Sequence, residues 1–114
     1  MPPTTNRPRF LAYDRALEGV RLTREFLARV KAGNRSLGDQ LVRAASSVVL
    51  NLAEGSQRRG ADRAHFYRIA AGSAAEVRGV LDAAAAFGFV EADEIAGASD
   101  RFDQVVAMLR PLTR

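Results

Sequence analysis

The chain offers few side chains for catalysis or for binding a metal. His65 is its only histidine, and it contains no cysteine. A histidine-based metal site needs companion ligands, and di-iron helical proteins place Glu-x-x-His on their helices. Here Glu54 is followed three residues later by Gln57, and Glu76 is followed by Gly79. The sequence therefore predicts no metal site, no cofactor and no enzymatic activity, and it makes His65 a surface or interface residue.

One stretch of the chain is rich in arginine. Four arginines fall within residues 58–68, together with His65, Phe66 and Tyr67, whereas residues 91–103 carry five acidic side chains and one arginine. Guanidinium groups neutralise phosphates, which supply most of the affinity in non-specific nucleic-acid binding. We expect these arginines to contact RNA or DNA, and the alternative is an ordinary solvated face. The predicted nucleic-acid-binding residues are Arg43, Arg58, Arg59, Arg63 and Arg68.

Polar side chains also line the edges of two predicted helices. At 100° per residue, four polar residues of segment 40–54 fall within about 60° of one another, beside the apolar stripe. Such side chains usually fix helix packing through hydrogen bonds, and the alternative is a ligand or subunit surface. A glycine inside the next helix, Gly72, indicates close approach of another helix. The predicted structural or interface residues are Gln40, Ser47, Asn51, Glu54, Gly55, Gly72, Ser73 and Glu76.

The composition is that of a small globular protein. Of 114 residues, 47% are hydrophobic and 26% are charged, and the formal net charge is +4. Lys31 is the single lysine among 17 basic residues. Arginine enrichment is also typical of a GC-rich genome, so charge alone does not establish a polyanion partner. The absence of cysteine excludes disulfides and favours the cytoplasm, and no apolar run approaches the roughly 20 residues of a membrane span.

Proline and glycine divide the chain into segments with helical periodicity. Prolines occur only at positions 2, 3, 8 and 111, and apolar residues recur at spacings of three and four. We predict helices over residues 8–32, 36–56, 61–88 and 91–112, after a disordered lead over residues 1–7. Short connections make consecutive helices antiparallel neighbours. Residues 8–114 are therefore expected to form one domain, an all-α, antiparallel up-down-up-down four-helix bundle.

The apolar stripe of each segment defines the expected core. The first stripe consists of large side chains such as Phe10, Leu17 and Val20, the third ends at Phe87, and the fourth ends at Leu112. A helix gathers such a stripe on one face. The residues predicted to form the core are Leu41, Val48, Leu52, Ile69, Val77, Val80, Phe102, Val105 and Leu109.

Two runs of residues resemble the signatures of a known family. Residues 40–55, QLVRAASSVVLNLAEG, are similar to a signature of the four-helix-bundle proteins encoded in intervening sequences of bacterial 23S ribosomal RNA genes. Residues 66–76, FYRIAAGSAAE, are similar to the second signature of that family, and the two runs have the family's spacing. Together with the helical pattern, the resemblance covers residues 10–112 and implies the bundle fold.

The chain departs from the family pattern at three positions. Val42 stands where the family often has a basic residue, which weakens a nucleic-acid role carried over from the family. Val49 stands where the family has proline, so the helix over residues 36–56 is expected to bend less. The aromatic residue common in the first helix is represented at most by Tyr13.

The resemblance implies partners rather than a reaction. Members have no established enzymatic activity, and the ribosomal label sometimes attached to them reflects gene location. Relatives include the accessory variability proteins of diversity-generating retroelements, which form homopentamers and bind nucleic acids and a reverse transcriptase. The resemblance therefore implies a homo-oligomer, with a pentamer favoured.

Two functions compete at this point. The leading prediction is a non-catalytic homo-oligomer that binds nucleic acid through the arginines, because a ring of identical subunits repeats each cationic patch. The alternative is a protein–protein interaction scaffold with no nucleic-acid role, favoured by the polar edges and by small residues on the third helix. A steep decrease in affinity with salt distinguishes phosphate binding from the alternative.

Overall fold

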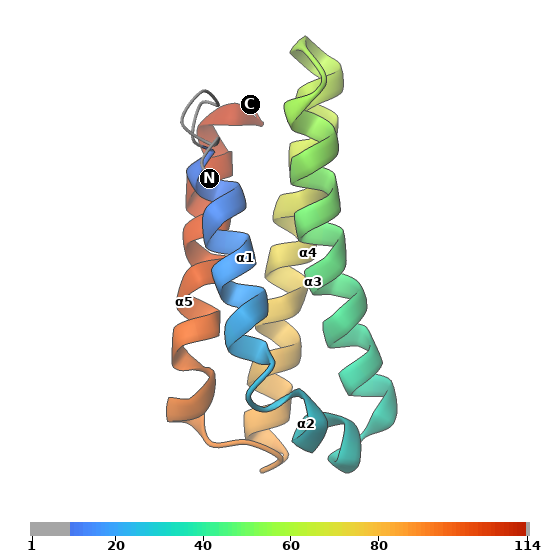
Figure 1. Ribbon diagram of the computed structural model, residues 1–114, viewed down its shortest axis with the longest axis vertical. Coiled ribbons are helices and arrows are strands. Elements are labelled where there is room, and N and C mark those ends of the chain that lie inside the picture. Colours follow the sequence, from blue (N-terminus) through green and yellow to red (C-terminus); the bar gives the residue numbers. More distant parts are fainter. Residues whose placement is uncertain (1–9, 114) are drawn as a thin grey trace, which may run out of the picture.

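The structure, a computed structural model, describes residues 10–113 and is helical almost throughout (Figure 1). No strand occurs among residues 10–113, which confirms the predicted all-α class. The predicted lead over residues 1–7 lies outside the described residues. The helices are α1 (Leu11–Thr23), α2 (Leu27–Gly33), α3 (Arg35–Ser56), α4 (Gly60–Ala86) and α5 (Ala92–Leu109), followed by the 3-10 helix η2 (Arg110–Leu112).

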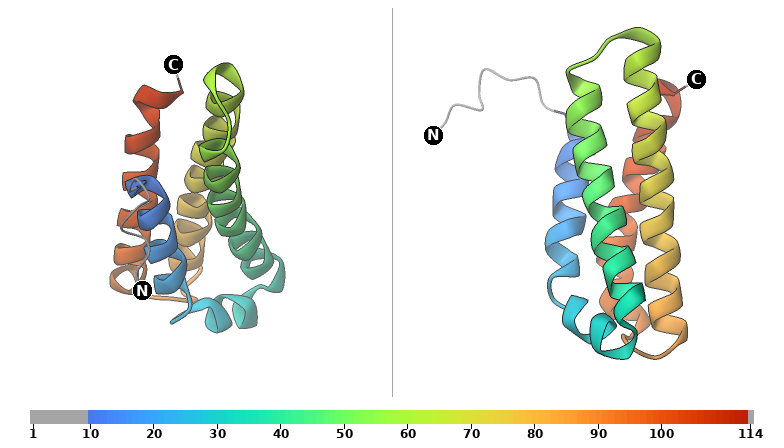
Figure 2. Two further views of the ribbon diagram at one scale, coloured as in Figure 1. Left: turned by 45° about the horizontal axis from the view of Figure 1, so that its top comes forward. Right: turned by 90° about the vertical axis from the view of Figure 1, so that its right-hand side faces the viewer.

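The long helices lie side by side along the longest dimension of the molecule, 42 Å. α3 packs against α4, α5 packs against α4, and α1 packs chiefly against α5 (Figure 2). α1 makes fewer contacts with α3, and the short helix α2 packs on α3. The side of the molecule between α1 and α3 is therefore the less tightly closed one.

The single first helix predicted over residues 8–32 is wrong, because the chain leaves the α-helix at Thr23 and resumes it at Leu27. Thr23 Oγ1 donates to the carbonyl of Val20 (2.6 Å), the acceptor that the amide of Arg24 would need to continue the helix. The Arg24 amide donates instead to the carbonyl of residue 21 (3.2 Å). The resulting turn redirects the chain and buries Phe26.

Most of the predicted core is confirmed, with exceptions on α4 and at two helix ends. The prediction that Ile69 lies in the core is wrong, because 38% of this residue is exposed. Its neighbours Tyr67 and Ala70 occupy the inner face of α4. Phe87 and Leu112 are also exposed, because the first follows the end of α4 and the second lies in η2. The predicted core residues that are buried are Leu41, Val48, Leu52, Val77, Val80, Phe102, Val105 and Leu109.

α1 buries its smallest side chains instead of its largest, so the expected face of this helix is wrong. Leu17 and Val20 are only partly buried. A Cβ atom on Gly19 would come within 2.6 Å of Phe102 Cε2, so this glycine lets the α1 backbone lie directly on a buried ring of α5. The buried residues of α1 are Ala12, Ala16, Gly19 and Thr23.

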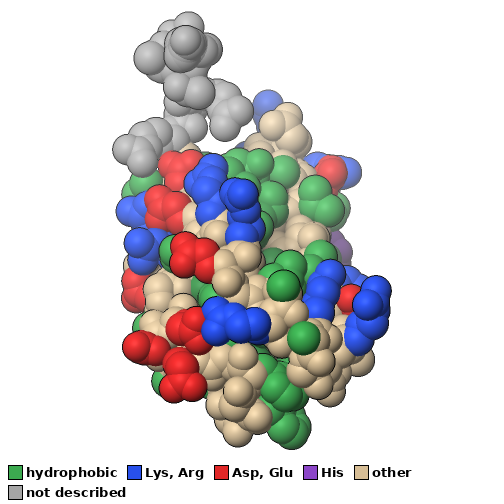
Figure 3. Space-filling view, turned by 60° about the horizontal axis from the view of Figure 1, so that its bottom comes forward, with side chains coloured by type: hydrophobic (Ala, Val, Ile, Leu, Met, Phe, Trp, Pro, Cys, Tyr) green, Lys and Arg blue, Asp and Glu red, His purple; other side chains and the backbone are tan. Residues whose placement is uncertain are grey.

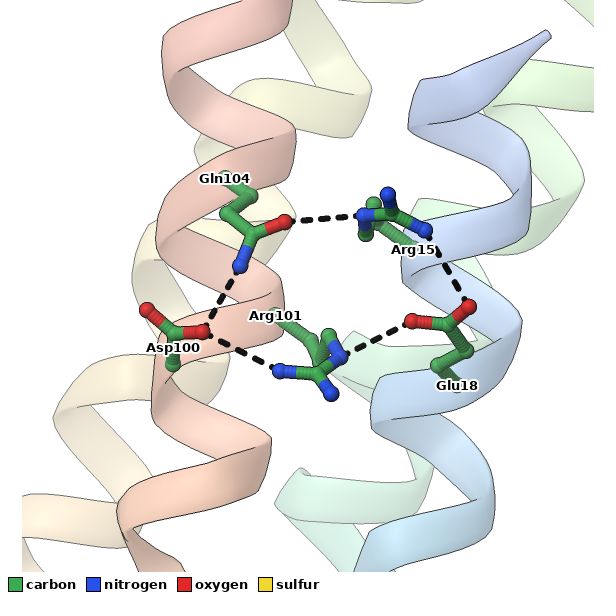
Figure 4. A network of polar contacts seen from close by, with 5 residues as sticks. All are labelled: Arg15, Glu18, Asp100, Arg101 and Gln104. Carbon is green, nitrogen blue, oxygen red and sulfur yellow. Dashed lines mark hydrogen bonds and ion pairs between the residues drawn. The ribbon is translucent and has the colours of Figure 1, made fainter.

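A closed ring of polar contacts reinforces the contact between α1 and α5 (Figure 4). Arg15 donates from Nε to Gln104 Oε1 (2.8 Å) and from Nη1 to Glu18 Oε2 (3.1 Å). Glu18 accepts in turn from Arg101 Nε (2.8 Å). Asp100 closes the ring by accepting from Arg101 (3.1 Å) and Gln104 (2.7 Å). Because ion pairs that remain partly exposed to water add little stability, we expect this ring chiefly to set the register of the two helices.

Local signals explain where two further helices begin. The side-chain oxygen of Asn34 accepts from the amide of Leu37 (2.9 Å), which caps α3. α5 begins with a capping box formed by Glu91 and Glu94. Arg29 donates to Glu94 (2.9 Å), and this hydrogen bond holds the pKa of Glu94 below its ordinary value. The same contact ties α2 to the start of α5.

We expect glycine-to-alanine substitutions on α1 and α5 to have opposite effects. Gly19→Ala should lower the free energy of unfolding by about 1–3 kcal/mol, because the new Cβ would press on the buried Phe102 ring. Gly97→Ala should raise it by about 0.5–1 kcal/mol, because the added atom would make only an ordinary contact with Leu22 Cδ1 (3.4 Å) and alanine favours the helix. Urea unfolding followed by circular dichroism measures both. Midpoints that move in the same direction would contradict the close packing of α1 on α5.

Candidate functional site

Three polar side chains form a hydrogen-bonded link between α3 and α4. The hydroxyls of Ser47 and Ser73 lie 2.7 Å apart. Asn51 Nδ2 donates to the carbonyl of Ser47 (2.8 Å) and to its hydroxyl (3.1 Å). All three residues are partly buried, where an unsatisfied polar group would be unfavourable. The structure therefore brings these three residues together, and their contacts hold the two helices in one register.

The other polar residues of the predicted set lie away from this link. Gln40 donates to Ser36 Oγ (3.4 Å) near the start of α3. Glu54 accepts from Arg58 at the end of the same helix. Glu76 is exposed on α4. The predicted set therefore does not form one continuous polar edge. Ser47, Asn51 and Ser73 link two helices, Gln40 and Glu54 each pair locally, and Glu76 is exposed.

The two glycines of the predicted set have different surroundings. A Cβ atom on Gly55 would come within 2.5 Å of Tyr67 Cε1, so this glycine permits α3 and α4 to meet closely. Burial raises the pKa of Tyr67 above its ordinary value. A Cβ atom on Gly72 would meet nothing within 4 Å, and the same is true of Gly79. Both of these glycines lie on the exposed outer face of α4.

Arg58 is the most heavily engaged of the predicted arginines. Its guanidinium donates to Glu54 (2.7 Å) and to Asp62 (3.0 Å), and these hydrogen bonds raise its pKa above the ordinary value. The guanidinium carbon lies 5.1 Å from the centre of the Phe66 ring, and His65 packs edge-on against that ring at 5.4 Å. The charge of Arg58 is therefore matched within the protein, and its main role is to organise the turn between α3 and α4.

Arg63 and Arg68 donate to backbone carbonyls. Arg63 donates to the carbonyls of Gly55 (3.2 Å) and Ser56 (3.4 Å) at the end of α3, where carbonyls have no i+4 amide within the helix. Arg68 Nη1 donates to the carbonyl of Thr113 (3.1 Å) and so ties α4 to the C-terminal segment. Neither guanidinium forms an ion pair within residues 10–113. Their positive charges are therefore available to an external anion.

Arg59 and Arg110 complete an arginine-rich end of the molecule. Arg59 is exposed just before α4, and Arg110 is exposed just after α5. The contact of Arg68 with the C-terminal segment brings Arg110 to this end, although sequence distance gave no signal for it. Arg43 lies 13 residues before the end of α3 at Ser56, about 20 Å along the helix at 1.5 Å per residue, and is not part of the group. We call Arg58, Arg59, Arg63, Arg68 and Arg110 the basic end.

Binding is the chemistry that the basic end can perform. Within residues 10–113, no three histidine, aspartate or glutamate side chains are grouped as metal ligands. His65, the only histidine, is exposed. None of the helices in this part of the chain has the length and hydropathy needed to span a membrane. Arginine recognises phosphate and carboxylate groups through charge and paired N–H donors, so the basic end presents a surface for anions.

A separate feature is an apolar groove of about 390 Å³ between α1, α2 and α3. One wall consists of side chains from α1 and α2, and the other consists of α3 side chains between Leu41 and Leu50. Arg24 is the charged residue in its lining. Val42 and Leu50 are 41% and 65% exposed. This groove is not predicted from the sequence, because it arises from the attachment of α1 to α5. Val42 and Leu50, two apolar residues outside the predicted stripe, are the signal for it in the sequence.

Comparison with known proteins identifies a matching family model and a similar solved structure. A family model described as 23S rRNA-intervening sequence protein matches residues 11–111. A crystal structure of a protein of unknown function from the S23 ribosomal protein family, from Bacteroides thetaiotaomicron, is similar with 18% sequence identity and a TM-score of 0.76. The similarity covers 90% of this chain and 98% of that chain, and it supports the fold alone. No curated protein sequence matches this chain significantly.

The hydrogen bond between Ser47 and Ser73 should be measurable as an energetic coupling. Each of Ser47→Ala and Ser73→Ala should lower the free energy of unfolding by about 1–2 kcal/mol, because each removes the hydrogen bond between the two helices. The double variant should be destabilised by less than the sum, with a coupling of about 0.5–1.5 kcal/mol. Ser46→Ala, on the exposed side of α3, is the control and should change stability by less than about 0.5 kcal/mol. Strict additivity in urea unfolding would show that the two hydroxyls do not interact.

Proposed function

We propose that this protein, which belongs to the family of 23S rRNA-intervening sequence proteins, is a non-catalytic helical protein that self-associates and binds nucleic acid at its basic end. In this proposal the chain is an antiparallel up-down-up-down four-helix bundle in which α1 and α2 together form the first member. The bundle supplies a rigid support, and surface arginines bind the partner. A cytoplasmic location fits a chain of 114 residues without cysteine.

The observation that carries the nucleic-acid proposal is the excess of arginine over acid at the basic end. Both acidic residues of the α3–α4 turn, Glu54 and Asp62, are engaged by Arg58. The other four arginines of the basic end form no ion pair within residues 10–113. Phosphates are the anions that such a group meets along RNA or DNA. Binding should be largely independent of base sequence, because phosphate contacts position a protein without reading bases.

Self-association is supported by the outer face of α4. Gly72 and Gly79 are exposed there, two turns apart, with open space beyond both. Glycine in a helix interior costs about 1 kcal/mol relative to alanine, so two exposed glycines call for a compensating contact. Close approach of a helix from a second subunit supplies one. The resemblance to homopentameric relatives favours a pentamer, in which each basic end would be repeated around one axis.

We expect the triple variant Arg59→Gln/Arg68→Gln/Arg110→Gln to bind RNA and DNA more weakly than the parent. The slope of log affinity against log salt should fall by about 0.7–0.9 for each arginine that touches a phosphate in the parent. Arg63 is left unchanged because it caps α3. Fluorescence anisotropy at several salt concentrations, with a single-stranded RNA and a DNA duplex, measures both effects.

The control removes the same charge from the opposite end of the molecule. Arg21→Gln/Lys31→Gln/Arg35→Gln changes the end of α1, α2 and the start of α3, and it should leave the salt slope close to that of the parent. Equal weakening in the two triple variants would assign binding to net charge and not to the basic end. A folded parent that binds no nucleic acid even at low salt would refute the proposal.

A separate prediction concerns assembly. Gly72→Leu/Gly79→Leu should reduce the mass of the native protein measured by light scattering, because the new side chains block close approach on the outer face of α4. Helical content should be retained, since neither side chain meets an atom of its own chain at the Cβ position. Ala107→Leu, on the exposed face of α5, is the control. A parent that is monomeric at micromolar concentration would show that self-association is wrong.

A further inference from the structure

We infer that the groove between α1, α2 and α3 is a docking site for an amphipathic helix with acidic flanks that belongs to another protein. None of the residues of the basic end lines this groove. The inference therefore goes beyond the proposed function and concerns a second, independent surface.

The groove exists because α1 is attached on one side only. Its small residues and the polar ring bind it closely to α5, whereas its contacts with α3 are sparse. Leu17 and Val20 line the resulting gap from α1, and Val42, Val49 and Leu50 line it from α3. Burying such an apolar surface is favourable in proportion to the area removed from water. The protein thus presents a ready-made apolar surface that a partner could cover.

The shape of the groove fits a helix better than a compact small molecule. Its lining on α3 extends from Leu41 to Leu50, about 14 Å at 1.5 Å per residue, which is two and a half helical turns. Val42 and Leu50 are 41% and 65% exposed, so the groove is open along its length instead of enclosed. Grooves of this form accept one face of an amphipathic helix, with apolar side chains at i, i+3, i+4 and i+7.

The charges beside the groove indicate the polarity of that helix. Arg24 lies in the lining, and Arg21 lies one turn earlier on α1. Arg35 and Arg43 are exposed on α3, against the single carboxylate of Asp39 on the same stretch. None of these four arginines forms an ion pair within residues 10–113. In Figure 3, Lys and Arg side chains predominate on the right of the view beside hydrophobic ones, and Asp and Glu gather at the lower left.

The chain itself offers no occupant with matching chemistry. Residues 1–9 contain two arginines, three prolines and no acidic residue, so they would bring like charge to Arg24. The acidic helix α5 of a second copy has its apolar stripe in the core. Other exposed apolar side chains, such as Ile69, Phe87 and Leu112, do not follow a helical i, i+3, i+4 row. The outer face of α4 presents glycines, which cannot fill a groove of about 390 Å³. These mismatches favour a partner from a different protein.

The test uses designed peptides as probes and the full chain as receptor. One fluorescein-labelled helical peptide carries leucine at i, i+3, i+4 and i+7 with glutamate at the flanking positions. A second carries lysine in place of glutamate, and a third is a scrambled glutamate peptide. The parent should bind the ordered glutamate peptide more tightly than either of the others. Leu50→Glu and Ser46→Glu, both at exposed positions in the lining, should each weaken that binding by about tenfold or more, as removal of a central anchor does.

Charge reversal provides a second and independent readout. Arg24→Glu should weaken binding of the glutamate peptide and strengthen binding of the lysine peptide. Unfolding would weaken the binding of both. Leu112→Glu, which is exposed outside the groove, should bind like the parent, and nucleic-acid affinity should be unchanged in Leu50→Glu. The inference is overturned if the parent does not distinguish ordered from scrambled peptide. It is also overturned if Leu50→Glu lowers the native mass while peptide binding is retained, because a second copy would then cover the groove.

Discussion

The close contact between α1 and α5 is the constraint on which the other surfaces depend. Gly19 lets a helix backbone rest on the Phe102 ring, and the polar ring around Arg15 and Glu18 holds that contact in register. The small residues of α1 bring it close to α5, and α1 makes fewer contacts with α3. Leu17 and Val20 of α1 line the gap that remains between these two helices. The small residues of α1 thus determine where the groove lies.

The arginines are divided between structure and surface. Arg58 is neutralised by Glu54 and Asp62, and Arg63 satisfies the carbonyls at the end of α3, so both help to build the turn that they occupy. The side chains of Arg59 and Arg110 form no such contact within residues 10–113. A count of positive charge in this stretch therefore overstates what a phosphate meets. Only the arginines that form no ion pair within the protein are available to a ligand.

The two surfaces suit different kinds of partner for physical reasons. The basic end carries exposed arginines, whose charge acts over a distance and is screened by salt. The groove is apolar and recessed, where affinity comes from area removed from water and charge mainly selects the partner. If the two proposals hold, the bundle connects a nucleic acid at its basic end with a protein helix at its groove.

The sequence by itself determined the all-α class, most helix boundaries and eight of the nine core residues proposed, because periodicity and helix-stop residues act locally. It did not determine the break after Thr23, where the Thr23 hydroxyl donates to the carbonyl of Val20. Nor did it show that Arg68 binds the C-terminal segment that carries Arg110, or that Arg43 lies apart from the other arginines. Those outcomes belong to the tertiary structure, because contacts between helices depend on which faces meet and how closely, and small residues such as Gly19 reveal that distance only when the opposite side chain is known.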